Sequence, residues 1–145
     1  MLFVRLAMLL IAVATGAFAQ SEGPISAEAA KKLKSPIPYS KKSIAQGRSV
    51  YARYCVGCHG PDGKATVDVV ADATDLTDPK LWKSGVSEGE IYRSIRDGQG
   101  ASMPAFKTQI KQPDDLWHLV NFIRSLWPDS ARPALSEDKS SESTK

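Results

Sequence analysis

Two cysteines and a histidine in this sequence are spaced to hold a cofactor covalently. They lie in Cys55-Val56-Gly57-Cys58-His59, a C-x-x-C-H pattern with thiols about one helical turn apart and an imidazole directly after them. This pattern is typical of haem c attachment. Each thiol can add across a haem vinyl group to form a thioether, and His59 can then reach the iron. The sequence therefore predicts one covalently bound haem c, attached through Cys55 and Cys58 and ligated by His59.

The same residues allow three other interpretations. A structural zinc site needs four Cys or His ligands. The sequence has only Cys55, Cys58, His59 and His118 and contains no His-x-His pair, so zinc fits poorly. A thioredoxin-like redox pair would lie in a βαβ pattern, which the flanking sequence does not show. The two cysteines could also be a chance pair of buried thiols. An export signal and a second candidate iron ligand, described below, favour haem.

The second candidate ligand is Met103, in a glycine-rich loop at residues 98–106. The other methionines, Met1 and Met8, belong to an N-terminal leader. Pro104 removes an amide donor and restricts Met103 to extended backbone, which stiffens the loop. A lone methionine often fills a gap in a core, but haem iron in electron carriers commonly takes a His/Met pair. We predict that Met103 is the second axial ligand.

Three further side chains are candidates for contact with the haem. Trp82 either packs in the core or donates its indole N–H to a haem propionate. A buried indole needs an acceptor in either case. Arg96 is expected to be solvated or to reach a propionate. His118 falls on the polar side of its helix with Asn121 and Ser125, so we expect a solvated residue rather than an iron ligand.

Capping patterns mark the helices that must position these residues. A capping box at Ser43 and Gln46 predicts a helix that starts at Ser43 and runs into the C-x-x-C-H motif. Further caps and a glycine stop predict a short helix over 78–85, a helix over 87–98 and a last helix over 113–128.

The predicted first helix has one apolar face, formed by Ile44, Gly47, Val50, Tyr51, Tyr54 and Cys55. Gly47 is unexpected there, because glycine costs a helix interior up to about 1 kcal/mol relative to alanine. Close approach by another helix would explain it.

The chain of 145 residues suits one domain with irregular ends. Residues 1–19 read as a secretory signal peptide, with Arg5 before an apolar run and small residues at its end. We expect a flexible linker over 20–42, a haem domain over 43–128 and a disordered polar tail over 129–145. The core is small, so the apo-protein should fold poorly without the haem.

The formal net charge of +3 gives no indication of nucleic-acid binding. Basic residues gather before the motif and acidic residues after it: Lys31, Lys32, Lys34, Lys41, Lys42, Arg48 and Arg53, then Asp62, Asp68, Asp72, Asp75 and Asp78. These charges are either a solvated surface or a means of steering an acidic redox partner.

Residues 43–127 together resemble a class I c-type cytochrome. The resemblance rests on Gly47-x-x-x-Tyr51-x-x-x-Cys55-x-x-Cys58-His59-Gly60, Ile95-Arg96-x-Gly98, Met103-Pro104-x-Phe106 and Leu119-Val120-x-Phe122-Ile123. It implies an all-α fold in which the N- and C-terminal helices cross and two shorter helices surround one covalent haem. In this family the crossing lies near a glycine and aromatic side chains, which would pair Gly47 with Leu119 and Phe122.

The resemblance also implies a function. We expect a periplasmic, monomeric electron carrier and not an enzyme, which docks transiently with redox-partner proteins through a His/Met-ligated haem and meets the membrane only if the leader is retained. The alternatives are a dedicated cytochrome subunit of a respiratory or dehydrogenase complex, and an open-site haem enzyme or gas sensor.

Overall fold

The computed structural model describes residues 23–65 and 73–137, and within these ranges the chain is helical without any β-strand. The predicted leader and residues 138–145 of the predicted tail lie outside the described residues. The helices are α1 (Ala27–Lys32), α2 (Lys41–Tyr54), α3 (Val56–His59), the 3-10 helix η1 (Pro79–Leu81), α4 (Glu88–Asp97) and α5 (Pro113–Ser125). The all-α fold class predicted from the sequence is confirmed.

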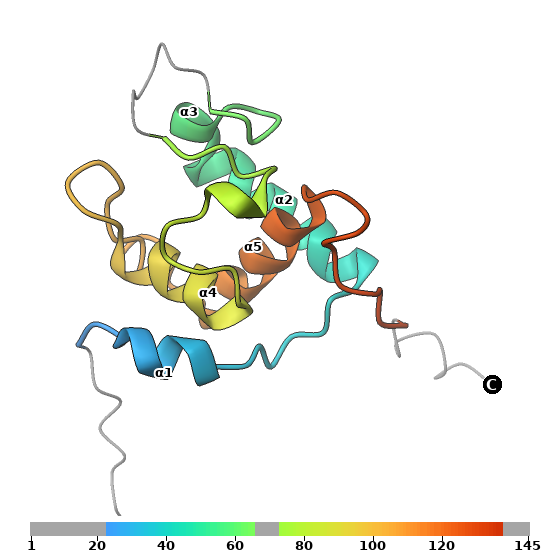
Figure 1. Cartoon of the computed structure of the whole chain (residues 1–145), viewed down its shortest axis with the longest axis horizontal. Coiled ribbons are helices and arrows are strands. Elements are labelled where there is room, and N and C mark those ends of the chain that lie inside the picture. Colours follow the sequence, from blue (N-terminus) through green and yellow to red (C-terminus); the bar gives the residue numbers. More distant parts are fainter. Residues whose placement is uncertain (1–22, 66–72, 138–145) are drawn as a thin grey trace, which may run out of the picture.

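Helices α2 and α5 cross and form the centre of the molecule (Figure 1). The apolar face predicted for the first helix is turned inward: Gly47, Val50, Tyr51 and Cys55 are buried. It meets the apolar face of α5, whose buried members include Leu116, Leu119, Val120, Phe122 and Ile123. The rings of Tyr51 and Phe122 lie 5.0 Å apart between the two helices.

Gly47 lies at the crossing point, as expected. A Cβ atom built there would collide with the backbone carbonyl of His118 and lie 2.8 Å from the Cβ of Phe122. Backbone atoms on α5 cannot move aside without moving the helix, so only glycine permits this separation of α2 and α5. The predicted pairing of Gly47 with Phe122 is therefore confirmed.

Replacing Gly47 with alanine should destabilise the protein although alanine is the better helix former. We expect the free energy of unfolding to fall by about 2 kcal/mol or more, because overpacking outweighs the propensity gain of about 1 kcal/mol. Urea unfolding of the haem-loaded protein, followed by helical circular dichroism, measures this. Ser49→Ala, on the exposed face of the same helix, is the control. Equal stability of the two variants would contradict the packing described here.

The start of α2 differs from the prediction. The helix begins at Lys41, and the N-cap is Ser40, whose side chain accepts a hydrogen bond from the Ser43 N–H at 3.2 Å. Ser43 is inside the helix and its hydroxyl is turned towards α5, so the predicted capping box at Ser43 and Gln46 is wrong. Ser40, three residues upstream, caps the helix instead.

The later helices follow their caps more closely. Ser87 and Glu90 form both hydrogen bonds of the predicted capping box, and α4 ends before Gly98. Asp78 caps η1 as expected, but η1 ends at Leu81 instead of reaching Gly85. Trp82 then has extended backbone and leaves the helix.

The segment expected to be a flexible linker packs against the domain. Helix α1 lies beside α4 (Figure 1), and the Ile25 N–H donates to the Asp97 carboxylate at 2.8 Å. Arg93 donates to the Ile25 carbonyl at 2.8 Å, and Tyr39 is buried. Composition rich in lysine and proline predicted solvation, whereas backbone groups of the segment find partners on α4. Further along the chain, the Ser136 N–H donates to the Tyr39 carbonyl.

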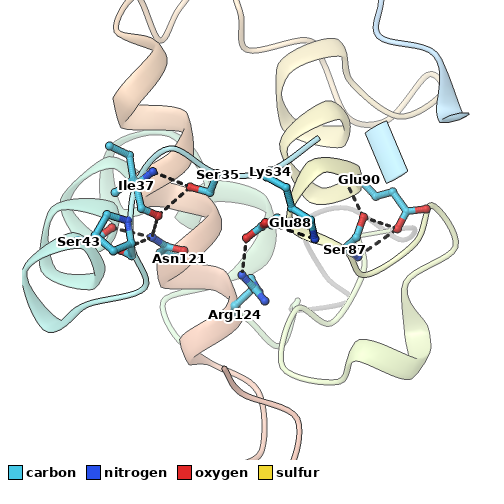
Figure 2. Close-up of polar contacts among 10 residues, drawn as sticks. Lys34, Ser35, Ile37, Ser43, Ser87, Glu88, Glu90, Asn121 and Arg124 are labelled. Carbon is cyan, nitrogen blue, oxygen red and sulfur yellow. Dashed lines mark hydrogen bonds and ion pairs between the residues drawn. The ribbon is translucent and has the colours of Figure 1, made fainter. Parts of the chain in front are cut away.

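Polar side chains on α5 hold this segment in place (Figure 2). Asn121 is 1% exposed and donates to the Pro38 carbonyl at 3.0 Å and to the Ser43 hydroxyl at 2.9 Å. One turn later, Arg124 bonds Glu88 of α4 at 3.2 Å, and Lys34 lies 3.8 Å from the same carboxylate. The polar side of α5 is therefore an internal contact surface.

His118 was expected to be solvated, and Arg96 to be solvated or to reach a propionate, but both have partners within the protein. His118 is not free in solvent, because its Nδ1 atom lies 2.9 Å from the Ser43 hydroxyl. The Arg96 side chain is 16% exposed, pairs with Asp97 at 2.6 Å and donates to the Gly23 carbonyl. His118 thus contacts α2 and Arg96 contacts the segment before α1, and the helical periodicity of α4 and α5 alone could not reveal either contact.

Candidate functional site

A cavity of about 330 Å³ lies beside the α2–α5 pair, and all five predicted site residues line it. These residues are Cys55, Cys58, His59, Trp82 and Met103. They come from three separate stretches of the chain: the end of α2 with α3, the segment after η1, and the loop after α4. A volume of this size is in the range of cofactor and ligand pockets.

The two cysteines stand at the junction of α2 and α3. Cys55 ends α2 and precedes the single turn of α3, which carries Cys58. Cys55 is buried, and burial raises the pKa of its thiol to about 12, with the neighbouring Cys58 adding to the effect. Cys58 is exposed, and neither thiol is in a disulfide. The turn is closed by the Tyr51 hydroxyl, which donates to the Gly60 carbonyl at 2.6 Å.

The His59 imidazole is held in one orientation by the backbone. Its Nδ1 atom lies 3.0 Å from the carbonyl oxygen of Thr74. A carbonyl can only accept, so Nδ1 carries the proton and Nε2 keeps its lone pair. Burial lowers the pKa of His59, while the bond to Thr74 opposes that shift. The ring is thus a neutral imidazole at neutral pH with Nε2 available to a metal.

Met103 is carried by a loop that folds back on the end of α4. Gln99 and Met103 exchange backbone hydrogen bonds of 3.0 and 3.3 Å, and these close the loop. A Cβ at Gly98 would lie 2.7 Å from the Met103 carbonyl oxygen, so Gly98 is needed both for its φ of +81° and for this contact. Beyond the loop, the Phe106 N–H donates to the Ile95 carbonyl at 3.0 Å.

Trp82 has a buried indole nitrogen without a hydrogen-bond partner among the described residues. Its neighbour Trp127, with ring centroids 6.4 Å apart, donates its own indole N–H to the Leu76 carbonyl at 3.1 Å. A buried polar group left unpaired costs about 1–3 kcal/mol. An orphaned donor on the wall of this cavity therefore fits a ligand that brings an acceptor, such as a carboxylate.

Several wall residues were not singled out by the sequence. Thr74 orients His59 through its backbone carbonyl, for which no side-chain pattern exists. Ser84, Ser94 and Gln99 also line the cavity and bond to one another. Ser84 and Ser94 have no distinctive spacing, and Gln99 was visible only as a polar residue between two glycines.

Comparison with known proteins places this site in a family. Residues 42–123, more than half of the chain, match the family described as cytochrome c oxidase, cbb3-type, subunit III. The chain belongs to this family. The resemblance to class I c-type cytochromes is confirmed, and so is the cofactor: proteins of this kind bind haem c covalently, and Cys55 and Cys58 fit that attachment.

One relative in this family is the cbb3-type cytochrome c oxidase subunit FixP of Bradyrhizobium sp. (strain ORS 278), 32% identical over 82 residues. The match covers 57% of this chain and 27% of that relative. The chain thus corresponds to about a quarter of that subunit's length.

Two solved structures share the fold. Cytochrome cL from Hyphomicrobium denitrificans has a TM-score of 0.52 at 21% identity, covering 72% of this chain and 61% of that one. The KustC0563 c-type cytochrome has a TM-score of 0.50 at 28% identity, covering 57% of this chain and 98% of that one. In the residues that the structure describes, no helix combines the length and apolar character needed to cross a membrane.

Removing the haem should unfold much of this cytochrome domain. An empty cavity of 330 Å³, at about 24 cal/mol per Å³, costs at most about 8 kcal/mol, which is comparable with the whole stability of a domain. We expect the Cys55→Ser, Cys58→Ser double variant, made without attached haem, to lose its cooperative thermal transition. Circular dichroism of the variant and the haem-loaded protein makes the comparison. A haem-free chain with the native transition would show that the fold does not depend on the cofactor.

Proposed function

We propose that this cytochrome carries single electrons through a six-coordinate haem c with His59 and Met103 as axial ligands. The observation that supports the proposal most strongly is that these two side chains line the same cavity as Cys55 and Cys58. Once the predicted leader is removed, Met103 is the only methionine, so no other thioether could take that position. When bound, haem c supplies a one-electron ferric/ferrous couple.

The residues of the chain would each have a distinct part in this function. Cys55 and Cys58 form the thioethers that hold the cofactor, and the Thr74 carbonyl keeps His59 in the tautomer that presents Nε2. Met103 would supply a thioether ligand to the iron from a loop stiffened by Pro104. Trp82 would donate its indole N–H to a haem propionate. Fixed ligands on both sides keep structural change on electron uptake small.

A role as a free carrier and a role as a subunit of a larger complex are both compatible with this chemistry. The KustC0563 c-type cytochrome matches over 98% of its length, which supports the carrier, since a unit of this size can be a complete cytochrome. The relative FixP is named as a subunit of a cbb3-type oxidase, and this supports the second candidate. Co-purification of the native protein with a large membrane complex would favour the subunit.

We further propose that the protein acts in the periplasm as a monomer. The apolar run of the leader supports export. Redox partners would dock transiently through a small, wet interface at the mouth of the cavity. The open-site enzyme or gas sensor remains the least supported function, because Met103 lines the same cavity as His59.

The spectrum of a Met103→Ala variant tests the axial ligand. The ferric wild-type protein should be low-spin and show the thioether-to-iron charge-transfer band. The variant should lose the band completely, because no other thioether can replace Met103, and its reduction potential should fall.

The variant should keep both thioether bonds and its helical signal, which serve as controls for folding and haem loading. A charge-transfer band that persists in Met103→Ala would mean that another group ligates the iron.

Replacing Trp82 with phenylalanine tests the propionate contact. A donated N–H draws negative charge away from the carboxylate, so its loss should favour ferric iron and lower the reduction potential by tens of millivolts, about 1 kcal/mol. Redox titration of the purified protein measures the shift. Trp117→Phe is the matched control, since Trp117 is buried and stacked on Tyr92 at 4.1 Å and does not line the cavity. Equal reduction potentials in the Trp82→Phe and Trp117→Phe variants would mean that Trp82 has only a structural role.

A further inference from the structure

A chain of three hydrogen bonds runs along the cavity wall next to Met103. The Ser84 hydroxyl donates to the Gln99 side-chain carbonyl at 2.7 Å. The Gln99 amide nitrogen donates to the Ser94 hydroxyl at 3.0 Å, and Ser94 donates to the Glu90 carbonyl at 2.9 Å. The Glu90 carbonyl can only accept, so it takes the one proton of the Ser94 hydroxyl. Ser94 must then accept from the Gln99 amide nitrogen, which leaves the Gln99 side-chain oxygen to accept from Ser84. The Gln99 amide is thereby clamped between the segment after η1 and helix α4.

The backbone of the same residue is bonded to Met103. The Gln99 N–H donates to the Met103 carbonyl at 3.0 Å, and the Met103 N–H donates to the Gln99 carbonyl at 3.3 Å. Residues 100–102 between them are exposed, and among the described residues they have no hydrogen bond to the rest of the domain. The side chain of Gln99 therefore attaches to the domain, and its backbone attaches to Met103.

We propose that Gln99 is the positioning residue that keeps Met103 directed into the cavity. The inference rests on the proposed function, in that Met103 is taken as the axial ligand. Gln99 would act on the iron through Met103 and not as a ligand itself. It lowers the frequency with which the loop swings away, and so protects the iron from outside ligands.

The proposal differs from a general contribution to stability. Ser94 is 4% exposed and lies on α4, a helix that is fixed by its own capping box and by Glu88 and Arg124. Losing the Gln99 bonds would free the loop while leaving α4 in place. The effect should therefore appear at the axial position, under conditions in which the domain is fully folded.

Competition by free imidazole measures this directly. Imidazole displaces Met103 from ferric iron, and the loss of the charge-transfer band reports the displacement. Four haem-loaded variants are compared with the wild type: Gln99→Leu, Ser84→Ala, the double variant of these two, and Gln109→Leu. Gln109 is exposed, and its side chain has no part in the hydrogen-bond chain, so Gln109→Leu is the matched control.

Gln99→Leu should bind imidazole about tenfold more tightly than the wild type, since two modest hydrogen bonds are lost. Ser84→Ala should do so about threefold, and the double variant should be no tighter than Gln99→Leu, because Ser84 acts through Gln99. Gln109→Leu should match the wild type.

An unchanged imidazole affinity in Gln99→Leu would overturn the proposal, even if the variant unfolded at a lower temperature. Met103→Ala separates this result from a failure of the proposed function. If that variant keeps the band, the axial ligand is wrong; if it loses the band and Gln99→Leu behaves as the wild type, only the role of Gln99 is wrong.

Discussion

The close approach of α2 and α5 at Gly47 is the constraint on which the rest of the structure depends. It sets where α2 runs and therefore where Cys55, at its end, enters the cavity wall. Ile123, on α5, reaches the same wall. A side chain at position 47 would separate the helices and move the two cysteines relative to α4 and the Met103 loop. One glycine on a helix thus determines the geometry of a site two turns away.

The second constraint is that the two candidate ligands must be oriented by backbone groups from outside the α2–α5 pair. His59 is oriented by the Thr74 carbonyl, and Met103 by backbone bonds to Gln99. Both anchors use backbone groups, whose positions are insensitive to side-chain identity. On the cavity wall, the Trp82 indole nitrogen has no hydrogen-bond partner among the described residues.

The helices and the site were predictable because their signals are local. The C-x-x-C-H spacing, the capping box at Ser87 and the lone Met103 are short patterns with a direct chemical meaning, and these residues meet as expected. The predictions that were wrong concern residues whose positions are set by tertiary contacts. Ser43 was taken as a cap and His118 as solvated because nothing local shows that the two residues meet where α2 packs on α5. Arg96 was taken as solvated because nothing local shows that the segment before α1 reaches α4. The sequence could not predict the role of Thr74, because Thr74 acts through its backbone carbonyl. It could not predict the role of Gln99, because the serines that Gln99 bonds form no recognisable pattern in the sequence.

The central claim is that His59 and Met103 complete one closed iron centre. X-ray absorption at the iron edge of the ferric, haem-loaded protein tests it most directly, because sulfur and nitrogen neighbours scatter differently. The account predicts one sulfur neighbour in addition to nitrogen, and its disappearance in Met103→Ala. A wild-type spectrum that contains only nitrogen or oxygen neighbours would contradict it.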